Sequence, residues 1–506
     1  MYRFDGVGRH PISATLDSEV ICPDAPGDVY QFNRFGYRSA EPKADPKFII
    51  YVVGCSHTFG TGIADHQRWS EKLACYLAEW LEIDRQDVDL QNFSQSGASN
   101  TYITRTILAA CEQRRPDLVI IQYTHAHRAE FFSEAEHENI GPWSLDQENI
   151  AGRAWTPGIA YYATYSNKVG NMDLIKKMML CHFFLRNRDI PYIFSWVEKE
   201  AIDDSNNTND PDLAPLIKLV RQINLVDYSP ISPDVLVDAS SHHPGPISQD
   251  RFAVRLFHDC KLLALRPGGP THSALKDTTI PMNEVTASGL QFWGAFSDGL
   301  EAALREQWNT NRSLRWSIQS TKSLDRIVRS LLTGRQDRST VNCIFVPNVT
   351  SFEHSTELGT IELDGASAAA LPARIRENVE LRYSYETDAN ALLRHLLNLL
   401  CIQEMMNQRG HRSILFDYAL KRENLPTATA RIHKLLAFTE VGPQIGLLGN
   451  GPDLPDLARR YSGFCRAFKV GKPPALSSSL LQRLQKIVRR KKESIRTRDP
   501  NIYPLW

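Results

Sequence analysis

Apolar residues along this chain gather in short runs, and the stretches between the runs place apolar residues at helical spacing. The first run, from Phe48 to Val53, is continuously apolar and rich in β-branched residues, which is typical of a strand buried on both faces of a sheet. Further predicted strands occupy 88–93, 118–123 and 192–196, and helical spacing occupies 68–80, 101–112, 174–186 and 249–263. Alternating strands and helices predict an α/β fold with a mainly parallel sheet in three layers.

The residues that follow the first strand carry the first candidate for chemistry. The segment Gly54-Cys55-Ser56-His57-Thr58-Phe59-Gly60 is rich in small residues and predicts a tight strand-to-helix turn. Such a turn places Ser56 beyond the carboxyl end of the strand, where open α/β sheets hold their reactive groups. Ser56 is therefore a candidate nucleophile. The alternative is a serine that only caps the next helix, since serine is preferred at that position.

Later positions supply the other groups that a serine hydrolase needs, which are a base and donors for the oxyanion. His243 stands in a loop rich in proline and glycine before the last helix of the first half, from which its ring could reach the first strand end. The backbone N–H groups of Ser56 and Gly97 and the side-chain amide of Asn100 are candidate oxyanion donors. In this order on successive strand ends, these residues predict nucleophilic catalysis.

The chain resembles the SGNH, or GDSL-type, hydrolase superfamily through an ordered set of motifs, Gly54-Cys55-Ser56-His57-Thr58, Gly97 with Asn100, and His243-Pro244-Gly245. The resemblance covers roughly Phe35 to Leu263 and includes the lead-in Asn33-Arg34-Phe35-Gly36-Tyr37-Arg38. It implies a flavodoxin-like three-layer fold and ester hydrolysis through an acyl-enzyme, often on acetylated sugars or lipid esters. By position, Ser56 would be the nucleophile and one oxyanion donor, Gly97 the second donor and His243 the general base.

Two departures from the family pattern concern the nucleophile and the oxyanion. Cys55 stands where the family has an aspartate, which leaves the serine itself in place. The family's Gly-x-Asn-Asp block at the end of the third strand is replaced by Tyr123-Thr124-His125-Ala126, so the asparagine that would donate to the oxyanion is missing. Asn100 or His125 would then take that role.

A third departure concerns the acid that orients the histidine. Ser240 stands three residues before His243, where the family has an acid, and Asp238 is near enough for a looser loop to bring it to Nδ1 of His243. The alternative is a Ser-His dyad in which a backbone carbonyl orients the ring. A metal pair of His242 and His243 is not favoured, because adjacent side chains point to different sides and no carboxylate stands at ligand spacing. No metal and no cofactor are expected.

Composition narrows the class of protein. The 506 residues balance 58 Lys and Arg against 58 Asp and Glu, so no overall field favours nucleic acid or an anionic membrane. The nine cysteines are scattered without CxxC spacing, which favours reduced core thiols over disulfides or zinc. The sequence begins without an apolar signal region, and no apolar run approaches the ~20 residues that span a bilayer. We expect a soluble protein, cytoplasmic or virion-associated.

The second half repeats residues of the first at nearly constant spacing. Eight residues between Gln95 and Ile120 recur 224 positions later, and Tyr165 and Cys181 recur 220 positions later. The common order of these matches predicts a duplicated α/β unit. Chance and a shared amphipathic pattern are the alternatives.

The second copy lacks the candidate chemistry. Thr321 and Leu324 occupy the positions of Gly97 and Asn100, and no histidine matches His243. Ser297, in the counterpart of the nucleophile turn, would be inert without a base and donors. The copy is therefore expected to serve packing, pairing with the first unit, or binding.

These patterns divide the chain into an amino-terminal arm (1–45), an SGNH-like hydrolase domain (46–265), a linker (266–285), a degenerate SGNH-like repeat (286–470) and a tail (471–506). The tail holds an amphipathic basic helix with the run Arg489-Arg490-Lys491-Lys492. Such a helix could bind a phosphate-rich surface or a protein partner, or pack on its own domain.

The expected activity is that of a serine esterase or deacetylase acting on an O-acyl ester, with an acetylated glycan as one candidate substrate. Transfer of the acyl group to a sugar or polymer hydroxyl would use the same residues. The rival function is a non-catalytic structural or binding protein on the same scaffold, such as a phage virion component, because sequences with the Gly-Cys-Ser-His-Thr pattern resemble ones that phages carry. In that case the second copy and the tail would serve assembly.

Overall fold

The computed structural model describes parts of both halves of the chain. These are residues 20–21, 29–132, 137–145, 158, 161–162, 165–197, 208–223, 225–226, 243–263 and 265, and then 289–294, 315–320, 324–333, 340–345, 352–356, 359–363, 388–409, 412–417, 432, 434–436 and 438–440. The chain divides into two compact units, of which the first holds the residues up to Ala274 and the second begins at Leu275. None of the described helices has both the length and the apolar character needed to cross a bilayer.

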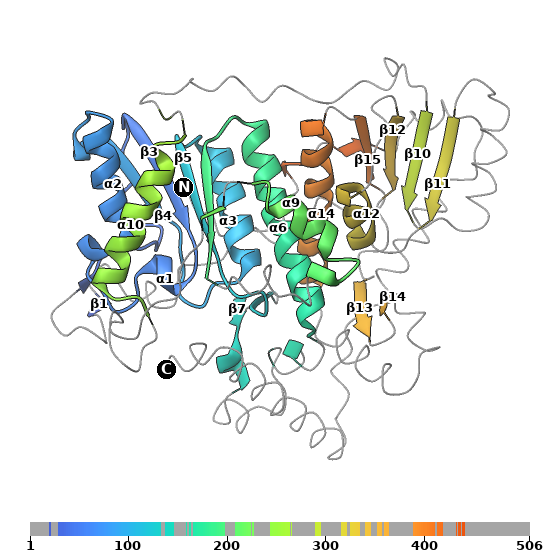
Figure 1. Ribbon diagram of the computed structural model, residues 1–506, viewed down its shortest axis with the longest axis horizontal. Coiled ribbons are helices and arrows are strands. Elements are labelled where there is room, and N and C mark those ends of the chain that lie inside the picture. Colours follow the sequence, from blue (N-terminus) through green and yellow to red (C-terminus); the bar gives the residue numbers. More distant parts are fainter. Residues whose placement is uncertain are drawn as a thin grey trace. The chain divides into compact units, whose positions relative to one another are not determined.

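The first unit is built on a five-stranded parallel sheet (Figure 1). Its strands stand in the order β4 (Val88–Asn92), β3 (Phe48–Val53), β5 (Leu118–Tyr123), β8 (Tyr192–Trp196) and β9 (Leu225–Val226). β3 lies inside the sheet, where Tyr51 pairs with Gln91 on one side and with Val119 on the other. All residues of β3 and β5 are buried, as expected for parallel strands covered on both faces.

Helices cover both faces of this sheet (Figure 1). α2 (Trp69–Trp80) and α10 (Pro246–Cys260) pack against one face and share an apolar core with alternate residues of the strands. α3 (Asn100–Gln113) and α6 (Asn167–Asn187) lie on the other face, with the short α9 (Ala214–Val220) packed against α6. The three-layer α/β fold with a parallel sheet is therefore confirmed.

Element boundaries follow the sequence most closely where apolar residues mark them. β3, β5 and β8 have the predicted bounds. α6 begins at Asn167 rather than at Leu174, because Ser166 accepts a hydrogen bond from the N–H of Val169 (3.3 Å) and so caps a first turn that is mostly polar. α10 begins at Pro246, since proline suits the first position of a helix.

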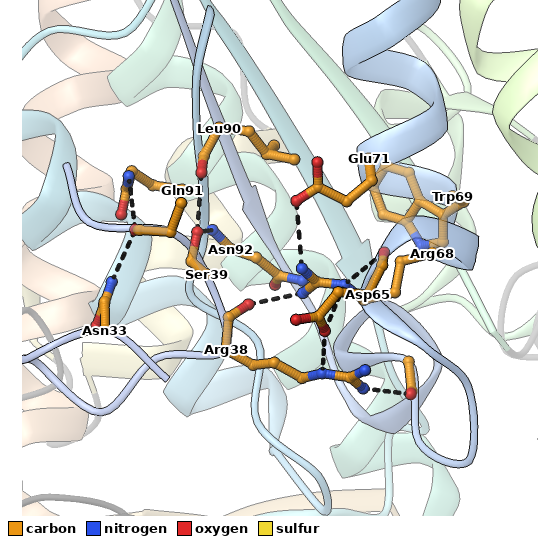
Figure 2. Close-up of polar contacts among 12 residues, drawn as sticks. Asn33, Arg38, Ser39, Asp65, Arg68, Trp69, Glu71, Leu90, Gln91 and Asn92 are labelled. Atoms are coloured by element: carbon orange, nitrogen blue, oxygen red, sulfur yellow. Dashed lines mark hydrogen bonds and ion pairs between the residues drawn. The ribbon is translucent and has the colours of Figure 1, made fainter. Parts of the chain in front are cut away.

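The lead-in before β3 is tied to the turn that follows this strand (Figure 2). The guanidinium of Arg38 is fully buried and donates to Asp65 Oδ1 (2.7 Å) and to the carbonyl oxygens of Phe59, Gly60 and Ile63. Burial, and then the neighbouring Arg68, lower the pKa of Arg38 to about 10, so the group stays charged at neutral pH. Carbonyl oxygens at a helix end carry partial negative charge, and the cation therefore stabilises the turn.

A short antiparallel hairpin, β6 (Ala129–Phe132) with β7 (His137–Ile140), follows β5. An ion pair between Arg105 of α3 and Glu130 of β6 connects it to the helices, with Arg105 Nε 3.1 Å from Glu130 Oε2. These side chains are only 2% and 0% exposed. Because a buried charge needs its partner close by, the pair fixes the hairpin against α3.

The second unit contains another parallel sheet, in the order β11 (Arg315–Ser320), β10 (Gly289–Gly294), β12 (Thr340–Phe345), β15 (Arg412–Asp417) and β16 (Phe438–Glu440). Counted within each sheet, both follow the order second, first, third, fourth, fifth. The intervening elements are α12 (Leu324–Thr333), the hairpin of β13 (Phe352–Thr356) and β14 (Gly359–Leu363), and α14 (Asp388–Arg409). A duplication would produce this common order, and the duplication itself stays a prediction.

Several predicted features lie outside the described residues. They include the linker 266–285, the tail 471–506, Ser297 and Thr321. The predicted domain boundaries therefore stay predictions.

Candidate active site

The turn after β3 is held by contacts that leave Ser56 little freedom. Ser56 begins the short helix α1 (Ser56–Phe59), which Gly60 closes with a φ of 80°. Behind it, the buried Thr58 Oγ1 donates to Gln122 Oε1 of β5 (2.6 Å). Gly54 must be glycine, because a Cβ at this position would lie 2.2 Å from Thr58 Oγ1. The expected strand-to-helix turn is therefore present.

Ser56 stands at the carboxyl edge of the sheet, where the strand order reverses. β3 lies between β4 and β5, so the loops that follow β3 and β5 leave the sheet at its topological switch point. Open α/β sheets bind ligands at this point. The side chain of Ser56 is buried, and its N–H, the first of α1, has no partner within the helix.

The histidine loop reaches the nucleophile turn. The buried ring of His243 lies 5.8 Å from the ring of His57, measured between centroids, and is nearly perpendicular to it at 75°. His57 directly follows Ser56 in the sequence. The fold thus brings the predicted base next to the neighbour of the predicted nucleophile, across more than half of the first unit's sequence.

One buried side chain joins these two segments. Gln249 of α10 donates from Nε2 to the carbonyl oxygens of His57 (3.2 Å) and Pro244 (3.5 Å). Its Oε1 accepts a hydrogen bond from the N–H of Trp69 (2.9 Å), at the start of α2. Gln249 therefore fixes the histidine loop against the nucleophile turn. Gln249 could not be predicted from the sequence, because a glutamine within an amphipathic helix carries no distinguishing pattern.

Two further histidines follow β5 at the same edge of the sheet. The buried rings of His125 and His127 stack with their centroids 5.2 Å apart. Burial lowers the pKa of His57 well below its ordinary value, and its neighbours His243, His125 and Arg128 lower it further. His57 is therefore neutral at neutral pH.

Asn100 is engaged away from the expected oxyanion. Its Nδ2 donates to the carbonyl oxygens of Thr124 (3.0 Å) and His125 (3.2 Å), and its Oδ1 accepts from the N–H of Thr124 (2.9 Å). Both amide hydrogens are thus directed at the backbone after β5. This arrangement speaks against the prediction that Asn100 donates to the oxyanion, since the amide instead holds the turn that carries His125.

Gly97 lies in the loop between β4 and α3 with a φ of 74°, a backbone conformation that favours glycine. A Cβ at this position would also lie 3.3 Å from Cζ2 of Trp143. Trp143 belongs to the short 3-10 turn η4 (Pro142–Leu145) that follows the hairpin. Gly97 therefore combines a required glycine conformation with a close aromatic neighbour, and its role as oxyanion donor stays a prediction.

The acid partner of His243 stays a prediction, because Asp238, Ser240 and His242 lie outside the described residues. Within the described part of the chain, no group of three or more His, Cys, Asp or Glu side chains is arranged to hold a metal ion. The polar cluster that follows the third strand marks His127 and Arg128, beside the predicted His125, as further candidate residues.

No family model and no curated protein matches the chain. Among solved structures it is similar to TesA, with 15% identity over 42% of this chain and 98% of that one and a TM-score of 0.25. It is also similar to the esterase EstA from Pseudoalteromonas sp. (14% identity, 42% and 97% covered, TM-score 0.23) and to a protein of the G-D-S-L family from Desulfitobacterium hafniense DCB-2 (11%, 42% and 98%, 0.24). These neighbours include an esterase and a GDSL-type protein, the class that the motifs resemble. Because these TM-scores are low, the fold and the candidate site are described from this chain's own residues alone.

Proposed function

We propose that this protein is a serine ester hydrolase of the SGNH type, acting through Ser56 and His243. The observation that carries the proposal is the contact between the rings of His57 and His243, reinforced by Gln249, which brings the histidine loop to the nucleophile turn at the switch point of the sheet. Nucleophile and base must lie together for a hydroxyl to be activated at neutral pH.

In the proposed reaction, the hydroxyl of Ser56 attacks the ester carbonyl while His243 accepts its proton and returns it to the leaving alcohol. Water then releases the acyl group from the serine, with His243 again acting as the base. Asp238 or a backbone carbonyl would orient the ring. The substrate is an O-acyl ester, for which an acetylated glycan is a candidate, and a sugar hydroxyl in place of water would give acyl transfer.

The oxyanion would be stabilised by the N–H groups of Ser56 and Gly97. Because the amide of Asn100 is engaged with the backbone, we assign the third donor to His125, which follows β5 where the family has its asparagine. His57 is neutral because burial lowers its pKa, so it places no positive charge beside these donors at the carboxyl edge of the sheet.

Covalent labelling tests the proposal. A fluorophosphonate reacts only with an activated serine, so we expect it to modify the full chain at Ser56, as found by peptide mass mapping, and not at Ser297. Replacing His243 by glutamine should prevent labelling, because the hydroxyl then loses its base. A chain that takes up no label at Ser56 would refute the esterase.

The alternative function, a structural or binding protein on the same scaffold, predicts that Ser56 is not labelled. Recovery of the unlabelled chain in assembled particles would support it. Where labelling succeeds, analysis of the products formed from an acetylated polysaccharide separates hydrolysis from acyl transfer.

Gln249 supplies a test of site geometry. Gln249→Leu and Gln249→Glu both remove the hydrogen bonds to the carbonyls of His57 and Pro244, whereas glutamate can still accept from Trp69. If positioning of the histidine loop matters, both variants should lower kcat by roughly 10- to 100-fold with little change in KM, since a small displacement of a catalytic group is costly.

The control for this prediction is Asp250→Asn, one residue along the same helix. Asp250 is half-exposed and contacts Lys72 and Tyr76 on the surface, so its replacement should leave kcat unchanged. Wild-type kcat in Gln249→Glu would mean that Gln249 only contributes to stability.

We also propose that the second unit is a non-catalytic copy of the first. The shared strand order and the residues Thr321 and Leu324 in place of Gly97 and Asn100 support this view. Its functions would be packing or binding.

A further inference from the structure

Arg128 lies on the loop between β5 and β6, directly after the stacked pair of histidines. Its Nε and Nη1 atoms are shielded from solvent, and neither has a hydrogen-bond partner among the described residues. Its guanidinium carbon lies 5.2 Å from the centre of the Trp143 ring. Shielded donors of a charged group are unfavourable without an acceptor, so this arrangement is suited to a ligand that supplies one.

The acidic residue nearest to Arg128 in the sequence pairs with another arginine. Glu130 forms the buried ion pair with Arg105. Two acidic positions of the family pattern are also neutral in this chain, with Cys55 before the nucleophile and Ala126 at the end of the Tyr123-Thr124-His125-Ala126 block. Within the described part of the chain, Arg128 therefore forms no ion pair.

Arg128 lies close to several residues of the proposed reaction centre. Its backbone N–H donates to the carbonyl oxygen of His125 (3.2 Å), the assigned oxyanion donor. Its charge acts on His57, the neighbour of Ser56. Trp143, the ring beside its guanidinium, lies against Gly97. A substrate group bound by Arg128 would thus lie beside the ester bond under attack.

We propose that Arg128 binds a carboxylate of the substrate, so that the site is selective for esters that carry one negative charge. A guanidinium is a strong partner for a carboxylate, because several N–H groups in one plane can donate to its oxygens. The ring of Trp143 restricts the orientation of that plane. Because Arg128 is a single guanidinium, we expect it to bind a substrate with a single carboxylate. This substrate class rests on the proposed hydrolase function.

Binding can be measured without turnover in the full-length Ser56→Ala variant. Two acetyl esters of equal size serve as probes in titration calorimetry, 4-acetoxybenzoate with a carboxylate and 4-acetoxybenzamide without one. We expect the carboxylate ester to bind roughly 10- to 100-fold more tightly, the range expected for a hydrogen bond to a charged group. Adding Arg128→Gln should remove this difference.

Matched variants separate the role of Arg128 from general effects of charge. Arg115→Gln removes the same charge before β5, at the opposite edge of the sheet, and should leave the preference intact. Arg128→Lys keeps the charge and should keep part of the preference, and it also serves if Arg128→Gln fails to fold by circular dichroism. Equal affinities for the two probes, or a preference that survives Arg128→Gln, would overturn the proposal.

Turnover by the wild-type chain shows which side of the ester carries the charge. Mono-4-nitrophenyl succinate bears its carboxylate on the acyl side and is compared with 4-nitrophenyl butanoate, and the acetoxybenzoate pair bears it on the alcohol side. If the anionic ester of one pair has a higher kcat/KM than its neutral counterpart, and Arg128→Gln removes the difference, the substrate carries its carboxylate on the side of the ester that this pair represents. If the anionic and neutral esters of both pairs are hydrolysed equally well, the carboxylate site is refuted and the hydrolase function is not. An absence of hydrolysis and of labelling at Ser56, with carboxylate binding intact, refutes the hydrolase alone.

Discussion

Replacing Ser56 by alanine is expected to lower the rate of ester hydrolysis by at least about 10³-fold. Alanine has no oxygen to attack the carbonyl, and the residual rate would come from binding and oxyanion stabilisation alone. The fold should persist, because the contacts that define the turn come from Gly54, Thr58 and Arg38 rather than from the serine hydroxyl. The measurement is kcat/KM for 4-nitrophenyl acetate with the full chain.

The control for this prediction is Ser297→Ala. Ser297 is the serine that the sequence comparison places in the corresponding turn of the second half, where neither a glycine nor a histidine matches Gly97 and His243. We expect its removal to leave the rate unchanged. A Ser56→Ala protein as fast as wild type would refute the assignment of the nucleophile, and a slow Ser297→Ala protein would show that the second half takes part in catalysis.

Replacing Arg105 by methionine is expected to lower the free energy of unfolding by about 3–5 kcal/mol, because it removes the guanidinium that pairs with the buried carboxylate of Glu130. The loss should be concentrated in the first unit, where the pair joins α3 to the β6–β7 hairpin. Chemical denaturation of the full chain gives the size of the change. Hydrogen exchange of the amides in α3 and β6 shows where it occurs.

The double variant Arg105→Met/Glu130→Leu should recover most of the lost stability, since an apolar pair can fill a site vacated by two buried charges. Lys47→Met offers the matched surface control, because the pair of Lys47 with Asp87 is 61% and 32% exposed and should contribute little. A single variant as stable as wild type would mean that the buried pair does not hold the hairpin.

The fold could be predicted from the sequence because most of its parallel strands are short and mainly apolar. The run from Phe48 to Val53 and the two that correspond to β5 and β8 have the bounds that the pattern gave, since strands covered on both faces are built mainly from apolar residues. Ser56 and His243 could be chosen as candidates for another reason. Each stands beside turn residues, and such residues mark strand ends and loops directly in the sequence.

The polar network around these residues could not be predicted, because each amide can bond to any backbone group that the fold brings near. Asn100 has the residue type of an oxyanion donor, yet its partners Thr124 and His125 stand 24 and 25 positions away in the sequence. Gln249 bonds to the carbonyl of His57, 192 positions away. Local spacing contains no information about such partners, and those of Gln249 depend on how α10 packs beside α2.

The two hairpins have the same pairing relative to their units. Ala129 pairs with Ile140 in the first, and Phe352 pairs with Leu363, each residue 223 positions later, in the second. If one ancestral unit gave rise to both, it already contained this hairpin after its third strand when it was copied. The hairpin would then be older than the two-unit chain, and the loss of the candidate catalytic residues from the second unit would be the more recent event.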